Sequence, residues 1–532
     1  MTSPATELPK DPEALKALVQ NLEVENAKLR DANRELTAKA LKFQDLYFGK
    51  SSEKTRPTAN ADDLRQAPLF QAELLAEAQQ AAEANNVSGS MSLTPGKPRR
   101  KGGRRSKFPK HLPRVETKYE LKDEERRCEC GCEEQMHLVG FETTKELERI
   151  ETTIVHTIKR AKYACRTCGT AMKTAPGPFR PFERALLGTG FIANMLTERF
   201  GNHMPFNRLE SKYRGEGLEL SRSTLERTAA RVAKRLAPLV DRLRAKIIGT
   251  GLLFMDDTPV TIARPIGSVD GSKKGRIWVY VDQDGNHVFD FSRDRKKEHP
   301  ERWLEGFKGA AHADAYSGYD AFFAQEDVTE IACWAHTRRY FTDAEDSEPE
   351  LTKEILSRIR DLFFVESASK EAGLTGDARR AFRQEKAMPI LMDIRAQLDL
   401  HAPSVLPKST MGKAISYALN QWDALMAYTT DGRFEIENNT AERALRPIAA
   451  GRKSWQFFLT EGGGENAAVI FSLIATAKAA GVSPVDYLRD VLVRIDVERD
   501  WEKLLPHAWQ EHFAPEVTRR REAAMRELCF VR

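Results

Sequence analysis

Heptad spacing of apolar residues marks the first stretch of the chain. Residues 13–45 contain no Gly or Pro, and an apolar side chain recurs at every seventh position, at Leu15, Leu22, Leu29, Leu36 and Phe43. With these as d positions, Asn26 and Asn33 fall at a positions, a combination typical of a parallel two-stranded coiled coil. The alternative is an amphipathic helix packed on its own domain, but charged flanks leave no second apolar stripe. We therefore expect a dimerisation helix within residues 1–50 and a homodimer or higher oligomer.

The apolar period then changes from helix to strand and back. Residues 181–248 have helical spacing, and the capped basic helix opening at Leu220-Ser-Arg-Ser-Thr-Leu225 resembles part of a helix-turn-helix, although many helical connectors look the same. From 249 to 345, three consecutive strand patterns precede strand–helix units, which predicts one mixed sheet in a multidomain α+β or α/β protein. The remaining segments are a helical insertion at 346–432, the rest of the core at 433–480 and a helical C-terminal region at 481–532.

The length of the chain predicts several domains, and its composition is that of a globular protein. A chain of 532 residues is too long for one core, and its 41% hydrophobic and 30% charged residues are ordinary for a globular protein with a charged surface. No apolar run reaches membrane-span length, and the N-terminus lacks a signal-peptide pattern, so we expect a cytoplasmic protein with no membrane partner.

Positive charge is unevenly distributed. Net charge is only +5, but the linker at 51–110 ends in a segment with seven cations and no acid. A solvated tail is the default for such a run. Between a dimerisation helix and a cysteine cluster, it is better explained as an arm that contacts DNA phosphates. Its candidate DNA-binding residues are Arg99, Arg100, Lys101, Arg104, Arg105 and Lys107.

Five of the seven cysteines cluster within residues 111–180. Cys165-x-x-Cys168-Gly is a knuckle that delivers two thiolates to one zinc ion, and two of Cys128, Cys130 and Cys132 would complete the site. Alternating residues between the two groups predict the strands of a zinc ribbon. Redox-active thiols are the alternative, but no thioredoxin-like βαβ pattern surrounds them, and four thiolates would make the Zn²⁺ structural. Elsewhere, Cys333 and His336 are too few for a zinc site and are interpreted as a packed cysteine and a helix-start histidine.

The first candidate metal-binding residues are Asp256 and Asp257, which directly follow the apolar run Gly251–Met255. Successive strand residues point to opposite faces, so one acid is a ligand and the other a flank. A lone strand-end Asp would be a turn cap, but two further acids follow: Asp314 after a second strand pattern, and Glu442 at a helix start. Three carboxylates of this kind form a hard-oxygen site for Mg²⁺ or Mn²⁺.

Cations accompany the third acid. An ion pair of Glu442 with Arg446 is the alternative to a metal role. We favour a place for Glu442 at the edge of the substrate-binding site, because Asn438-Asn439, Pro447 and Gly462-Gly-Gly464 are unfavourable in an ordinary helix. The candidate phosphate-binding residues here are Arg443, Arg446, Arg452 and Lys453.

Nine motifs in order resemble the transposases of the insertion-sequence-66 family. They are Phe48-Gly-Lys-Ser-Ser-Glu53, Lys162-Tyr-Ala-Cys165-Arg-Thr-Cys168, Leu220-Ser-Arg-Ser-Thr-Leu225, Asp256-Asp-Thr-Pro-Val260, Asp314-Ala-Tyr-Ser-Gly-Tyr319, Cys333-Trp-Ala-His336, Ala418-Leu-Asn-Gln-Trp422, Glu437-Asn-Asn-Thr-Ala-Glu-Arg443 and Gly451-Arg-Lys-Ser-Trp455. The resemblance implies a ribonuclease-H-like core with a DDE triad, interrupted by a helical insertion. Carried over, the triad is Asp256, Asp314 and Glu442, with Glu437 a lesser candidate. The family's Asp-Glu-Thr-Pro reads Asp256-Asp257-Thr-Pro here.

The predicted function is metal-dependent cleavage of double-stranded DNA at transposon ends and strand transfer into target DNA. Two Mg²⁺ ions about 3.5–4 Å apart would be held by the triad. The protein would act at the bacterial nucleoid, with accessory proteins an open question. The alternatives are a zinc-containing DNA-binding regulator with an inactive core, and a ribonuclease-H-like nuclease without strand transfer.

Overall fold

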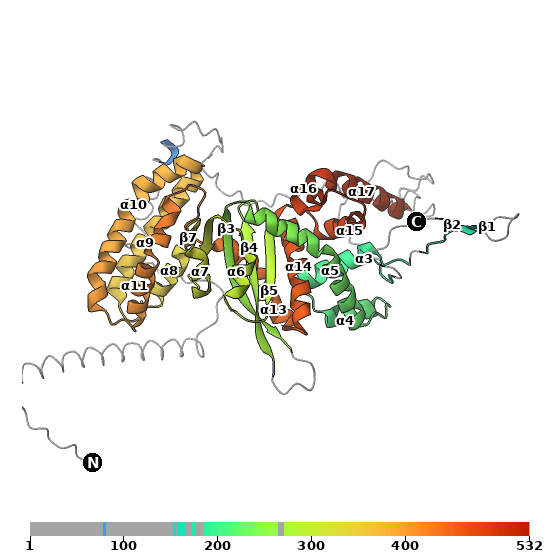
Figure 1. The fold of residues 1–532 in the computed structure, drawn as a ribbon, viewed down its shortest axis with the longest axis horizontal. Helices are drawn as coiled ribbons and strands as arrows, with labels where there is room; N and C mark the ends of the chain where they lie inside the picture. The colour runs from blue at the N-terminus through green and yellow to red at the C-terminus, as the bar shows by residue number, and fades with distance from the viewer. Residues whose placement is uncertain are drawn as a thin grey trace, which may run out of the picture. The chain divides into compact units, whose positions relative to one another are not determined.

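The computed structural model describes residues 78–80, 153–155, 157–164, 172–175, 182, 185–263 and 271–530 (Figure 1). The predicted coiled coil, the basic arm and the five clustered cysteines lie outside these residues. The described chain forms two compact units. The sheet unit contains Leu243–Ala468 and residues 78–80, whereas the helical unit contains the other described residues up to Arg242 and those from Val469 onward.

A mixed sheet organises the sheet unit. Its strand order is β5–β4–β3–β6–β7, and the short strand β8 also pairs with β3. β3, β4 and β5 pair antiparallel, whereas β6 and β8 run parallel to β3, and β7 runs parallel to β6. The prediction of one mixed sheet is confirmed. The strands are β3 (Leu252–Ile262), β4 (Lys273–Asp282), β5 (His287–Ser292), β6 (Gly309–Ala313), β7 (Val328–Ala332) and β8 (Phe457–Phe458).

Strand β3 is longer than its apolar run. The sequence predicted a strand that ends at Asp256, but β3 pairs with β4 as far as Ile262. Only the pairing with β6 stops early, at Phe254. Backbone hydrogen bonds to β4 therefore keep the chain extended through polar residues that the hydrophobic pattern reads as a strand end.

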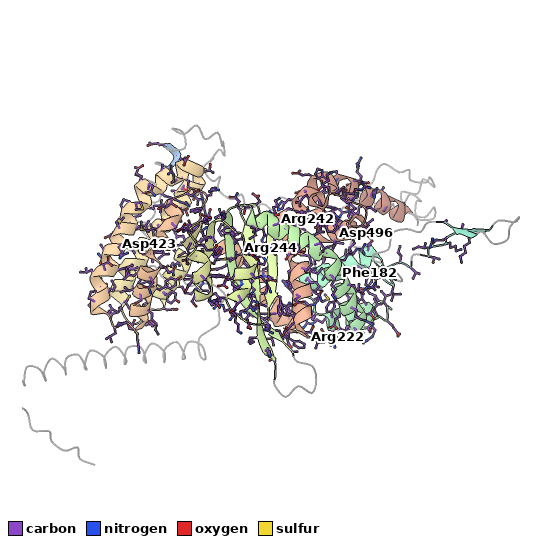
Figure 2. The ribbon with its side chains drawn as sticks, viewed as in Figure 1. Phe182, Arg222, Arg242, Arg244, Asp423 and Asp496 are labelled. Atoms are coloured by element: carbon purple, nitrogen blue, oxygen red, sulfur yellow. The ribbon has the colours of Figure 1, made fainter. Side chains whose placement is uncertain are left out.

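Helices cover both faces of the sheet. Tyr280 of β4 stacks on Trp303 of α6 with ring centroids 3.5 Å apart, and Arg244 donates to the Trp303 carbonyl at 2.9 Å (Figure 2). On the opposite face, Arg452 of α13 donates to Oγ1 of Thr258 at 2.9 Å. The helical elements are α6 (Glu298–Trp303), η3 (Ser317–Tyr319), α7 (Asp320–Phe323), α8 (Trp334–Thr342) and α13 (Asn439–Trp455).

Two segments predicted to be poor helices are continuous helices. α13 runs from Asn439 to Trp455 with Pro447 inside it, where the proline is exposed. Gly462 to Gly464 open α14 (Glu461–Ala479). A Cβ on Gly464 would lie 2.4 Å from the Phe291 ring, so this glycine permits close packing of a helix on the sheet.

Helices also fill the stretch between β7 and α13. They are α9 (Pro349–Glu371), α10 (Gly376–His401), η4 (Ala402–Ser404), α11 (Thr410–Asn420), α12 (Trp422–Met426) and η5 (Ala427–Thr429). α9 and α10 are joined by Arg383, whose fully buried guanidinium donates to both carboxylate oxygens of Glu366 at 2.7 and 2.8 Å. We call α9 to η5 the helical insertion.

The helical unit holds the predicted basic helix. Ser221 Oγ accepts from the Thr224 N–H at 3.3 Å and so caps α5, which begins at Arg222 after a turn containing Gly217 at φ 81° (Figure 2). No single described helix is long and apolar enough to cross a membrane, and α14 and α15 reach that length and hydropathy only together, as a bent pair. The elements are β1 (Lys162–Ala164), β2 (Met172–Thr174), α3 (Thr189–Leu196), the π-helix η2 (Thr197–Gly201), α4 (Phe206–Gly215), α5 (Arg222–Ile248), α15 (Pro484–Arg494), η6 (Trp501–Leu504), α16 (Pro506–His512) and α17 (Ala514–Phe530); α5 and α14 each run through a unit boundary.

Candidate active site

Asp256 of β3 and Asp314, which directly follows β6, are at equivalent distances along two adjacent parallel strands. The β3–β6 pairing ends with Phe254 opposite His312, and each acid lies two residues further along its own chain. Strand side chains alternate, so Asp256 shares the sheet face of Phe254, whose ring stacks on that of His312 with centroids 4.3 Å apart. Ala315 has φ 56°, which turns the chain away directly after Asp314.

Asp257 points to the other face and is neutralised there. Its carboxylate lies 2.9 Å from Arg276 Nη1 and 2.7 Å from Arg295 Nη2, and its side chain is 1% exposed. Arg295 also reaches Asp314, with Nη2 3.5 Å from Oδ2. As expected from strand alternation, Asp257 lies on the face opposite Asp256. Its contacts also place Arg295, which no sequence motif indicated, beside Asp314.

Glu442 is brought to β3 by two attachments of α13. The Asn438 side chain is fully buried and donates from Nδ2 to the Met255 carbonyl at 2.8 Å. Further along the helix, Arg452 Nη1 donates to the Pro259 carbonyl at 2.7 Å. Glu442 lies between these attachments, in the first turn of α13. Asn438, predicted as a helix cap, makes no side-chain capping hydrogen bond and instead ties the helix to the strand that carries Asp256.

Burial and the other two acids raise the pKa of Asp256. Burial is the largest effect, and with repulsion from Asp314, Asp257 and Glu442 it raises the pKa of Asp256 to about 7, although the Asp257 N–H opposes the shift. Oδ1 of Asp314 and Oε1 of Glu442 are buried without a hydrogen-bond partner. Divalent cations would supply the missing partner and offset the repulsion, so the three acids fit a hard-oxygen metal site.

Glu442 also belongs to a second group of side chains that could hold a metal ion. One ligand atom each from Cys333, His336 and Glu442 lies within 4.8 Å of the other two. Asp256 and Asp314 are outside this group, and among the described residues no ion pair joins Glu442 to Arg446. The sequence analysis had assigned Cys333 and His336 to packing, and their Cys-x-x-His spacing was the signal that could have indicated more.

The predicted phosphate-binding cations divide into two sets. Arg443, Arg446 and Lys453 are exposed along α13 and free to meet a polyanion. Arg452 is half-buried and holds β3, so its guanidinium positions the helix. The structure does not describe Arg99 to Lys107, or Cys128, Cys130, Cys132, Cys165 and Cys168, and these remain expectations from the sequence.

Three family models match the chain. The model described as "Transposase IS66 family" covers residues 184–466, "IS66 C-terminal element" covers 472–507, and "Transposase C of IS166 homeodomain" covers 35–117. Two similar curated proteins come from Sinorhizobium fredii (strain NBRC 101917 / NGR234). Uncharacterized protein y4jD is 30% identical over 529 residues, covering 95% of this chain and 97% of the relative. Uncharacterized protein y4hP is 31% identical over 420 residues, covering 73% and 74%.

The first model spans more than half of the chain, and y4jD matches nearly all of it. DDE transposases act on DNA and use divalent metal ions, which agrees with acids gathered on a sheet beside a cationic helix. The chain belongs to the IS66 transposase family.

Proposed function

We propose that the protein is a DDE transposase that cleaves transposon ends and joins them to target DNA, with Asp256, Asp314 and Glu442 as its catalytic triad. The observation that carries this proposal is the placement of Asp256 and Asp314 two residues beyond the last residues that pair β3 with β6, with α13 held against β3 on both sides of Glu442. The mixed sheet, with three antiparallel strands followed by parallel ones, supports a ribonuclease-H-like core.

The three carboxylates would hold two Mg²⁺ or Mn²⁺ ions, which when bound activate the attacking hydroxyl and stabilise the leaving oxygen of the phosphodiester. Asp256 must lose its proton for this, and cation binding lowers a pKa that burial and its neighbours have raised. Arg295, fixed by Asp257, adds positive charge beside Asp314. Arg443, Arg446 and Lys453 would contact phosphates and set the register of the DNA.

The rest of the chain would bind and pair DNA ends. We assign dimerisation to residues 1–50, phosphate contacts to the basic arm at 97–107, a structural Zn²⁺ to the cysteines of 111–180, and helix-turn-helix-like DNA contacts to 181–248. Within the last region, Arg222, Arg227 and Arg231 are exposed on α5, which supports a role in DNA contact.

The test incubates full-length protein with DNA carrying the element's own end and a target plasmid, with Mg²⁺ for cleavage and Ca²⁺ for binding alone. Asp256→Ala, Asp314→Ala and Glu442→Gln should each reduce cleavage at least about 1000-fold, because each removes a ligand from a site whose work is mostly electrostatic. End binding in Ca²⁺ should persist. Asp284→Ala, which removes an exposed acid in the β4–β5 turn, is the matched control and should cleave normally.

Each outcome has a distinct meaning. A variant that cleaves at a near-normal rate removes that residue from the triad. Cleavage without joined products identifies a nuclease, and end binding by the unaltered protein with no cleavage under any divalent metal identifies a DNA-binding regulator.

A further inference from the structure

The group formed by Cys333, His336 and Glu442 has the donors of a second kind of metal site. Cys333 directly precedes α8, His336 lies in the first turn of that helix, and Glu442 lies in the first turn of α13. The cysteine is fully buried, and the side chains of His336 and Glu442 are 19% and 23% exposed. With one ligand atom each inside a 4.8 Å limit, a thiol, an imidazole and a carboxylate can meet around one tetrahedral ion.

A backbone N–H group is hydrogen-bonded to the Cys333 sulfur. The Asn438 N–H donates to Sγ at 3.2 Å, whereas the His336 N–H donates to the Cys333 carbonyl at 3.1 Å. Burial raises the pKa of the Cys333 thiol, and the N–H groups of Asn438, His336 and Ala335 oppose that shift. The hydrogen bond from Asn438 is one that a metal-bound thiolate would keep.

Two of the three side chains carry polar atoms without hydrogen-bond partners. Oε1 of Glu442 and Nδ1 of His336 are buried and make no hydrogen bond, although Oε1 lies 3.7 Å from Nε2 of His336. The hydroxyl of Tyr417 is also buried without a hydrogen bond, and it interacts electrostatically with Cys333. Buried polar atoms almost always have partners, so these atoms favour an ion bound by the group.

We propose that Cys333, His336 and Glu442 bind a transition-metal ion of the Zn²⁺ type, in addition to the Mg²⁺ ions of the proposed triad, with Glu442 shared between the two sites. Thiolate and imidazole ligands favour Zn²⁺ or Co²⁺ over Mg²⁺, because Mg²⁺ prefers oxygen. The thiol proton leaves to solvent when the ion binds. The ion would tie α8 to α13 and fix Oε1 of Glu442. Binding itself needs neither DNA nor cleavage; only the consequence for the third acid rests on the proposed function.

Cobalt is the probe. Full-length protein, freed of metal and kept reduced, is titrated with Co²⁺ while thiolate-to-cobalt absorption and bound metal per chain are measured. The clustered cysteines at 128–168 can also take up Co²⁺, so the informative quantity is the difference between the unaltered chain and each variant. Cys333→Ser and His336→Ala should each lose one equivalent of tightly bound Co²⁺, and Cys333→Ser should also lose its share of the absorption. Cys529→Ser, which removes a thiol outside the group, should match the unaltered chain.

Two further variants separate this site from the catalytic proposal. Asp256→Asn should abolish cleavage yet keep the cobalt absorption, whereas Glu442→Gln should weaken both. The inference is overturned if folded Cys333→Ser and His336→Ala bind as much Co²⁺ as the unaltered chain, whatever their cleavage activity. If Cys333→Ser does not fold, His336→Ala and His336→Asn decide the matter by the same measurement.

Discussion

Asp256 and Asp257 carry the same charge in different surroundings. Burial raises the pKa of Asp257, but guanidinium groups of Arg276 and Arg295 within 2.9 Å oppose that shift. Asp256 accepts the Asp257 N–H at 2.7 Å, but its neighbouring side-chain charges include Asp314 and Glu442, which have its own sign. In the absence of a cation, the charged form of Asp256 is therefore disfavoured in the folded protein.

The raised pKa of Asp256 predicts how the stability of the folded protein changes with pH. The folded pKa of Asp256, about 7, lies above the value of about 3.9 for an unfolded aspartate, so the folded state holds more protons between these values. Stability in a chelator should then fall as pH rises from about 4 to about 7, by at most about 1.4 kcal/mol per pH unit from this residue. Asp256→Asn should flatten that part of the profile. Thermal unfolding across pH measures both.

Glu330 provides the matched control, because burial and repulsion from Asp320 and Asp314 also raise its pKa to about 7. Glu330→Gln should flatten the pH profile too, but it should retain the stabilisation that Mg²⁺ gives the unaltered protein. Asp256→Asn should lose that stabilisation. If Mg²⁺ raises the unfolding temperature of Asp256→Asn as much as that of the unaltered chain, Asp256 is not a ligand.

Single residues also show where sequence reasoning reached its limit. The acids could be found because apolar runs followed by a carboxylate are visible along the chain. Asn438 was interpreted as a cap and Arg452 as a DNA contact, because helix-start position and charge are all that a sequence gives for them. Their actual partners, the Met255 and Pro259 carbonyls, are remote in sequence and become neighbours only through tertiary packing.

At the scale of elements, the helical insertion is joined to the segment that leads into α13. Besides Glu366, Arg383 donates to the carbonyls of Tyr428 and Phe434 at 2.6 and 2.8 Å. Glu435 pairs with Arg379 at 3.0 Å and with Lys370 at 2.6 Å. Burial opposes ionisation of Glu435, but these cations lower its pKa to about 2. Helical periodicity predicted the insertion's helices, whereas this polar network between them has no sequence signature.

Removing the buried guanidinium should therefore be costly. Arg383→Met removes the guanidinium that binds both oxygens of Glu366 and leaves this buried carboxylate with Arg379 alone, at 2.7 Å. We expect a loss of about 3 kcal/mol of unfolding free energy, because one cation of a buried ion-pair network is gone. The cleavage rate should also fall, because the segment that leads to Glu442 loses the hydrogen bonds from Arg383 to the carbonyls of Tyr428, Asp431 and Phe434. Denaturant unfolding and single-turnover cleavage measure the two effects.

Arg395→Met is the control on the same helix, since the Arg395 pair with Asp399 is exposed and should contribute less than about 1 kcal/mol. Adding Glu366→Met to Arg383→Met should recover part of the lost stability, because it removes a buried carboxylate that has lost one of its two cations, while Arg379 keeps its pair with Glu435. Equal losses in the Arg383 and Arg395 variants would contradict a structural role for the buried network.

On the scale of the whole molecule, the site is assembled from distant stretches of sequence. Strand β3 supplies Asp256, the residue directly after β6 is Asp314, and α13 supplies the third acid after the entire helical insertion. A mixed sheet can be predicted from strand patterns, because they are local. The β3–β6 register and the attachment of α13 cannot, because they depend on contacts between segments that no periodicity links.

Under the proposed function, pairing of two DNA ends would need more than one copy of the site, and the predicted coiled coil of residues 13–45 would join two chains. In the predicted coiled coil, Leu22 and Leu29 occupy d positions in the apolar seam, where a charged residue has no compensating partner. Leu22→Glu with Leu29→Glu should convert dimers to monomers in sedimentation equilibrium. Lys28→Glu, outside the seam, should not. Monomers should still bind a single end in Ca²⁺ but yield few joined products; an unchanged mass for the double variant would place the dimer contact elsewhere in the chain.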